Sequence, residues 1–140
     1  MKRATTATAV AAVAIGLLVT AVADAQVKKG RSRPVTTKQL MSGIVQPNCA
    51  AIGAAVQQAP ADDKAWENLA TNAALLNELS YTLVDDGRCP DADWATAVTQ
   101  LRTASEAVLA KALAKDHAGV AAEFPKVTES CGTCHKAHKK

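Results

Sequence analysis

The residues best suited to chemistry lie near the C-terminus, where the sequence reads Cys131-Gly132-Thr133-Cys134-His135. The pattern C-x-x-C-H is typical of covalent attachment of a c-type haem. On a helix, two cysteines three residues apart share a face, so both thiols can add to the vinyl groups along one porphyrin edge. The imidazole of His135 follows directly and can bind the iron as proximal ligand. We therefore expect one covalent haem c, held by Cys131, Cys134 and His135.

Three other uses of two such cysteines are a thioredoxin-like redox pair, half of a zinc site and a structural disulfide. A redox pair belongs in a βαβ context, and no stretch of this sequence alternates like a half-buried strand. A zinc site needs two further ligands, and His117, His138, Cys49 and Cys89 lack zinc-like spacing. The complete five-residue pattern arises rarely by chance among four cysteines and three histidines, and it favours haem.

The composition limits the class of protein. A chain of 140 residues allows one domain of ordinary size. A hydrophobic share of 49% excludes a mainly disordered chain, and a net charge of +3 without a dense basic stretch gives no reason to expect nucleic-acid binding. Phosphate-binding loops and the common hydrolase motifs are absent. We therefore expect an electron carrier or haem-binding protein and not an enzyme.

The N-terminal segment is typical of a secretory signal. Lys2 and Arg3 precede an uncharged, apolar run that ends at Ala23-Asp24-Ala25, a small-x-small cleavage pattern. We expect a signal peptide over residues 1–25, a flexible leader over 26–35 and a helical domain over 36–140. An uncleaved membrane anchor is the alternative. Cleavage predicts a periplasmic protein without stable membrane insertion.

Hydrophobic periodicity predicts four helices, over about residues 36–58, 62–86, 91–112 and 116–138. Short connections between them favour an all-α, antiparallel, up-down-up-down four-helix bundle with the haem on the last helix. Pro47 predicts a kink or a break near Gly43 in the first helix. Pro125 interrupts the fourth helix, or begins a shorter last one. The predicted apolar stripes of the last three helices are Trp66, Leu69, Ala73, Leu76, Ser80 and Leu83; Trp94, Val98, Leu101, Ser105, Val108 and Ala112; and Val120, Phe124, Val127, Cys131, Cys134 and His138.

A C-x-x-C-H motif on the last helix of an exported, four-helix chain resembles the class II cytochromes c, which comprise cytochrome c prime and its low-spin relatives. The resemblance covers about residues 36–140. In that family the first helix often carries a methionine over the distal haem face, within a pattern like Arg-Gln-x-x-Met. Lys38-Gln39-Leu40-Met41 is similar, with lysine in place of arginine. The resemblance implies that Met41 is the distal residue, and that homodimers through the first helices are possible.

The role of Met41 separates two functions. If its sulfur binds the iron, the site is His/Met and six-coordinate, which suits transfer of single electrons between redox partner proteins. If Met41 only packs nearby as core filler, the iron is five-coordinate and can bind NO or CO. His117 is expected in an exposed connection. His138 shares a helix with His135, so the two imidazoles cannot bind opposite faces of one iron, and His138 is expected near the haem edge or in solvent.

Cys49 and Cys89 remain after the motif is assigned. Export permits a disulfide between them. In a straight helical hairpin, however, they would lie roughly 25 Å apart along the axis at 1.5 Å per residue, whereas a disulfide needs Cα atoms within about 7 Å. Only a real break at Pro47 would bring them together, so this pairing stays open.

Overall fold

The structure is a computed structural model that describes residues 34–85 and 87–139. The expected signal peptide and most of the expected leader lie outside the described residues. Within the described part, every regular element is helical and no strand occurs. None of the helices described there is long and apolar enough to cross a membrane.

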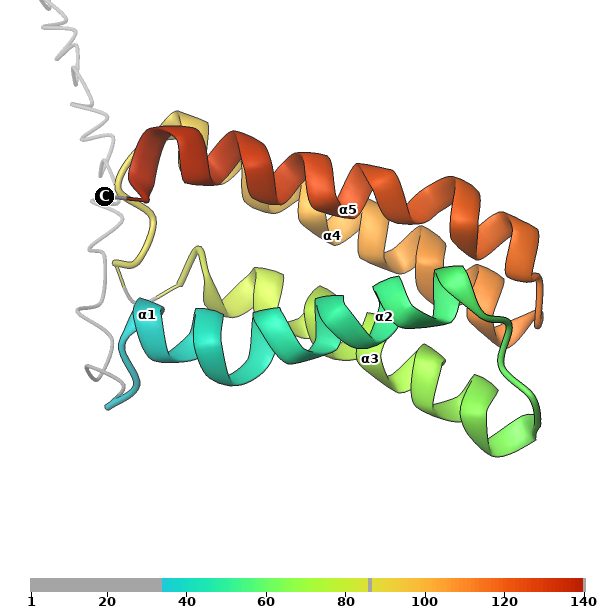
Figure 1. Ribbon diagram of the computed structural model, residues 1–140. Helices are drawn as coiled ribbons and strands as arrows, with labels where there is room; N and C mark the ends of the chain where they lie inside the picture. Colours follow the sequence, from blue (N-terminus) through green and yellow to red (C-terminus); the bar gives the residue numbers. More distant parts are fainter. Residues whose placement is uncertain (1–33, 86, 140) are drawn as a thin grey trace, which may run out of the picture.

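The described chain forms four helical rods. The first is composite, because α1, η1 and α2 follow one another without a loop. It is followed by three long helices, and consecutive rods run in opposite directions (Figure 1). The elements are α1 (Thr37–Leu40), the π-helix η1 (Met41–Val45), α2 (Gln46–Gln57), α3 (Asp63–Thr82), α4 (Ala92–Leu113) and α5 (His117–His138).

Each rod begins at a side chain that accepts a backbone hydrogen bond. Thr36 and Gln39 form a reciprocal capping box at α1. Asp62, Asp91 and Asp116 accept from the amides of the third residue beyond them, at α3, α4 and α5. Short polar side chains at these positions satisfy amides that have no partner inside the helix. The predicted starts of the first three helices are therefore confirmed.

The second predicted helix ends earlier than expected. We expected it to reach residue 86 and to stop at Gly87, but α3 ends at Thr82. The indole Nε1 of Trp94 donates to the carbonyl of Leu83 at 2.8 Å, which occupies an acceptor at this helix end. Gly87 has a φ of +72° and turns the connection toward α4.

Pro47 does not break the first rod, in which α1, η1 and α2 are continuous. Instead, the turn before it widens into η1, where the amide of Gln46 donates to the carbonyl of Met41, five residues back. Proline has no N–H and its ring crowds the carbonyl four residues earlier. The wider π turn accommodates the proline ring without interrupting the helix. The Asn48 side chain donates a hydrogen bond to the carbonyl of Ile44 at 2.7 Å.

Pro125 does not begin a shorter helix either, because α5 runs through it from His117 to His138. The proline lies on the exposed side of α5. Water can reach the helix there, so the lost backbone hydrogen bond costs less than it would inside the core. The last rod therefore carries the cysteine motif on an unbroken helix.

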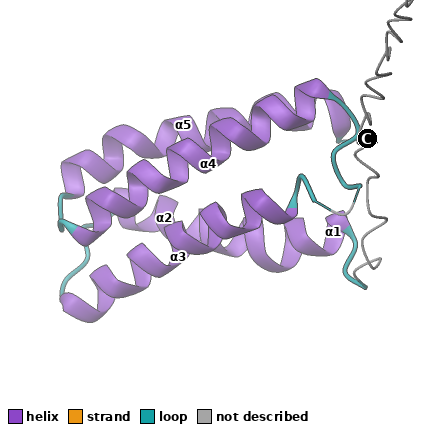
Figure 2. Cartoon of the chain, turned by 180° about the vertical axis from the view of Figure 1, so that it is seen from behind, coloured by secondary structure: helices purple, strands orange, loops and turns teal. Residues whose placement is uncertain are grey.

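The core lies between the rods. The composite rod packs on α3 and α5, and α4 packs along both α3 and α5 (Figure 2). The predicted stripe on α4 is buried throughout, the stripe on α3 is buried except for half-buried Trp66, and half of the stripe on α5 is buried. Ser105, in the stripe on α4, and Ser130, on α5, are buried, and their hydroxyls donate to carbonyls of their own helices at 2.7 Å. Many core positions are alanine, which lets the helices approach closely.

Asp116→Ala should destabilise the fold by removing the cap of α5. The amide of Gly119, followed by the Lys111 ammonium, holds the pKa of Asp116 below its ordinary 3.8. A lowered pKa contributes stability above the ordinary value, and this is lost as the pH falls through the lowered one. We expect a lower thermal midpoint for Asp116→Ala at neutral pH, with the difference from wild type vanishing in acid. Asp116→Asn keeps the cap and should fall between them; equal midpoints at neutral pH would contradict the assignment.

Candidate functional site

A small, mostly apolar cavity lies where η1 and the C-terminal half of α5 face each other. Its volume is about 30 Å³. In the described chain, no Cα of η1 lies within 8 Å of a Cα of α5, so these two elements border the cavity without packing tightly together. The lining residues are Met41, Val45, Leu83, Ala97, Val98, Leu101, Ser130, Cys131, Cys134 and His135.

The helix α5 brings the three motif residues to one wall of this cavity. Cys131 and Cys134 are three residues apart on an unbroken helix, so they share a face. Cys134 is buried, Cys131 is half-buried, and His135 lines the cavity while remaining exposed at its edge. Thiols and imidazole thus meet at one accessible edge of an apolar space.

Met41 reaches the same cavity from the opposite side. It is the first residue of η1 and is half-buried. Single π turns inside α-helices often occur at functional sites, and this one sets the angle at which Met41 enters the cavity. All four residues that the sequence singled out therefore border one space.

Burial governs the chemistry of the two motif thiols. It raises the pKa of Cys131 above the ordinary 9.0, against smaller opposing effects of a hydrogen bond with the Ser130 side chain and one with the backbone. The pKa of Cys134 is also raised, first by burial and then by the negative charges of Cys131 and Asp91. Both sulfurs are therefore mainly protonated thiols near neutral pH, which makes them weak nucleophiles.

The other two cysteines are free thiols in the structure, as are those of the motif. Cys49, on α2, is half-buried. Burial raises its pKa, and the negative charge of Cys131 raises it further, which places Cys49 within electrostatic reach of the motif. Cys89 lies in the connection between α3 and α4, where its thiol donates to the carbonyl of Asp91 at 3.4 Å.

The two remaining histidines do not line the cavity. His117 was expected to be exposed, but it is half-buried, and its Nε2 lies 2.9 Å from the carbonyl oxygen of Ala55, which draws it onto α2. His138 packs edge-on against Trp94 with ring centroids 5.2 Å apart, and its Nε2 lies 3.4 Å from Asp91 Oδ1. His138 thus joins the C-terminal turn of α5 to the first turn of α4.

The sequence did not reveal the whole wall of the cavity. In addition to the four predicted site residues, it is lined by Val45, Leu83, Ala97, Val98, Leu101 and Ser130. A signal existed for two of them, because Val45 lies four residues after Met41 and Ser130 four residues before Cys134, on the same helix faces. Leu83 and Ala97 become part of the site only through the packing of α3 and α4.

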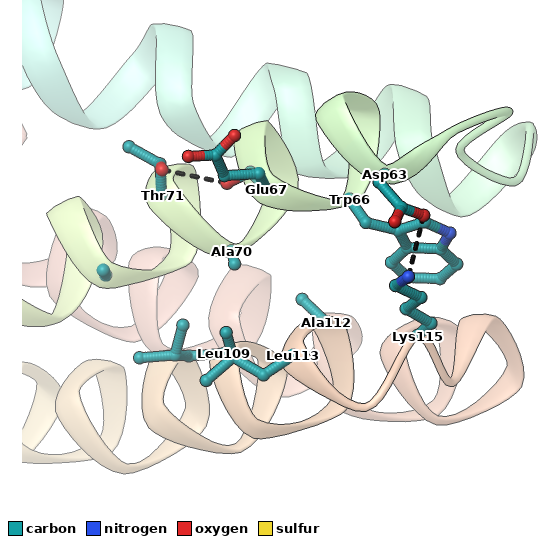
Figure 3. A pocket seen from close by; sticks show the side chains of 10 residues that line it. Asp63, Trp66, Glu67, Ala70, Thr71, Leu109, Ala112, Leu113 and Lys115 are labelled. Atoms are coloured by element: carbon teal, nitrogen blue, oxygen red, sulfur yellow. Dashed lines mark hydrogen bonds and ion pairs between the residues drawn. The ribbon is translucent and has the colours of Figure 1, made fainter.

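A larger, open groove of about 480 Å³ lies between α3 and α4, toward the opposite end of the molecule (Figure 3). Its floor is made of alanines and leucines, and the ion pair between Lys115 Nζ and Asp63 Oδ1, 2.7 Å long, closes one end. Its lining contains neither cysteine nor histidine. The groove is therefore separate from the cluster of sulfur and imidazole groups.

No three of the histidine, cysteine and acidic side chains in the described ranges are arranged to hold a metal ion by themselves. Compared with protein-family models, with curated proteins and with solved structures, the chain matches none. The interpretation of the site therefore depends on its residues and their arrangement.

The raised pKa values predict slow alkylation of the motif thiols. In the full chain without haem, we expect Cys131 and Cys134 to react slowly with iodoacetamide near neutral pH, and the rate to rise only as the pH passes above the ordinary pKa of 9.0. Mass spectrometry of the modified peptides measures each rate. The same chain in urea is the control, because exposure should restore ordinary reactivity. Equal rates in the folded and unfolded chain would contradict the burial argument.

Proposed function

We propose that this protein is an exported, periplasmic c-type cytochrome with a single covalent haem, which carries single electrons between redox partner proteins. The proposed architecture is the up-down-up-down four-helix bundle of the class II cytochromes c. The observation that carries the proposal is the convergence of Cys131, Cys134 and His135 with Met41 on opposite sides of one apolar cavity.

The residues present fit a haem c in their chemistry. Cys131 and Cys134 are free thiols on one helix face and can form the two thioethers. His135 can serve as proximal ligand and Met41 as distal ligand. The cavity of about 30 Å³ is smaller than a porphyrin, so binding requires η1 and α5 to separate. Their Cα atoms already lie more than 8 Å apart in the described chain, so the two backbones are not in direct contact there.

The chain's own residues give such a site its character. A bound haem iron supplies one-electron oxidation and reduction. The apolar side chains of Leu83, Val98 and Leu101 exclude water from the cavity, and a methionine sulfur as second axial ligand favours the reduced state and raises the potential. If His135 and Met41 both held the iron, little rearrangement would accompany a change of charge, which would favour electron transfer over gas binding.

The surface beside His135 suits contact with a partner protein. His135 is exposed, and Lys136 and Lys139 lie exposed on the same terminal segment. A cluster of positive charges at the edge of a redox site steers partners that carry negative charge. The proposed partners are therefore redox proteins with an acidic docking surface.

Coexpression with a cytochrome maturation system should yield a chain whose mass exceeds that of the polypeptide by one haem, retained after denaturation. Cys131→Ala and Cys134→Ala should each leave at most one thioether, and the double variant should lose covalent haem altogether. Cys89→Ala is the matched control, because Cys89 lies outside the cavity and should load normally. A fully matured wild-type chain with only the polypeptide mass would overturn the proposal.

Met41→Leu tests the distal ligand, because leucine keeps the volume and removes the sulfur. We expect the low-spin bands of the loaded wild type and its near-infrared sulfur-to-iron band, and we expect the variant to lose that band and to gain affinity for CO. Leu113→Ala, on the exposed surface, should leave the spectrum unchanged. A spectrum that Met41→Leu leaves unaltered would show that Met41 only packs nearby.

A further inference from the structure

The helices α2 and α5 meet through a small number of specific contacts. A methyl group placed on Gly53 would lie 3.4 Å from Cε1 of Phe124, in ordinary van der Waals contact, so the ring of Phe124 lies beside Gly53. His117 reaches the carbonyl of Ala55. His117, Phe124 and Cys131 are spaced by seven residues, which keeps them near one face of α5. Cys131 therefore lies on the side of α5 that faces α2.

Cys49 lies on the matching side of α2. It precedes Gly53 by four residues, so the two share a helix face. The helices α2 and α5 run in opposite directions (Figure 1). The path along α2 from Gly53 back to Cys49 therefore has the same direction as the path along α5 from Phe124 forward to Cys131. The negative charge of Cys131 raises the pKa of Cys49, which agrees with this placement.

The other possible partners of Cys131 and Cys49 are less favourable. Within an unbroken helix, Cβ atoms three residues apart are about 5–6 Å from each other, whereas a disulfide needs about 3.5–4.5 Å. A bond between Cys131 and Cys134 would therefore distort α5. The thiol of Cys89 contacts Asp91, and Asp91 lies beside His138. Along α5, His138 is seven residues from Cys131, or about 10 Å. Cys49 lies near Cys131, so Cys89 is the less favourable partner for either of them.

We propose that, before haem is attached, Cys49 and Cys131 form a reversible disulfide that joins α2 to α5. The oxidant is a small-molecule disulfide such as oxidised glutathione. The two thiols give up two electrons and two protons, which reduce that disulfide to two thiols, and a sulfur–sulfur bond forms between Cys49 and Cys131. A thiol reductant reverses the step.

This disulfide would shield one attachment sulfur from irreversible oxidation and hold η1 and α2 against α5 until a reductant frees Cys131. Its bearing on haem attachment rests on the proposed function, whereas the disulfide itself does not. Once Cys131 is consumed by a thioether, Cys49 remains as a free thiol. The structure thus assigns a use to a cysteine that lies outside the attachment motif.

The test uses the full chain purified without haem, equilibrated with oxidised and reduced glutathione, acid-quenched, alkylated and digested without reduction. We expect mass spectrometry to find the peptides of Cys49 and Cys131 joined, and dithiothreitol to separate them. The joined species should be lost in Cys49→Ser and retained in the matched control Cys89→Ser and in Cys134→Ser. A chain that joins only Cys131 to Cys134, or only Cys49 to Cys89, overturns the proposal, as does one that forms only glutathione adducts.

Two further measurements keep the result interpretable. Circular dichroism must show the same helicity for Cys49→Ser as for wild type, and Cys49→Ala replaces it if the serine variant fails to fold. Haem loading of Cys49→Ser by the maturation system is measured separately. A chain that forms the disulfide but never binds haem refutes the proposed function and leaves the disulfide standing. A chain that loads haem but never joins Cys49 to Cys131 refutes the disulfide and leaves the proposed function standing.

Discussion

The arrangement of the site depends on one constraint, which is that α5 must remain a single helix from His117 to His138. Only then do residues three and four positions apart share a face, so that Cys131, Cys134 and His135 reach one edge of the cavity. The cap at Asp116 holds one end of this helix, and packing of His138 on Trp94 holds the other. Between them, Pro125 is tolerated because it lies on the exposed side.

The opposite wall depends on a different solution to a similar problem. Pro47 lies inside the first rod, and the helix accommodates it by widening the turn before it rather than by breaking. This wider turn begins at Met41, the residue that enters the cavity. The two prolines therefore act differently because one faces solvent along a straight helix and the other follows a turn that can add a residue.

Much of the fold was predictable because the sequence carries it locally. Asp62 and Asp91 cap their helices as their positions suggested, and the stripe from Trp94 to Ala112 is buried throughout. The end of α3 was not predictable, since it coincides with a hydrogen bond from Trp94, which belongs to the next helix. The same holds for the site. The motif and Met41 were evident from residue type and spacing, whereas Leu83 and Ala97 join them only through packing between helices. His117 lies against α2 because its imidazole contacts the backbone carbonyl of Ala55. Every residue carries such a carbonyl, so no side-chain pattern could indicate this contact.

The ring of Phe124 on α5 lies beside Gly53 on α2, with room for a methyl group in ordinary van der Waals contact between them. Twelve residues away, or about 18 Å along the rod, no Cα of η1 lies within 8 Å of a Cα of α5. The first rod is therefore closer to α5 beside Phe124 than beside Met41. A side chain that enters the cavity from η1 must span this larger separation, which favours a long, unbranched residue such as Met41 over a short one.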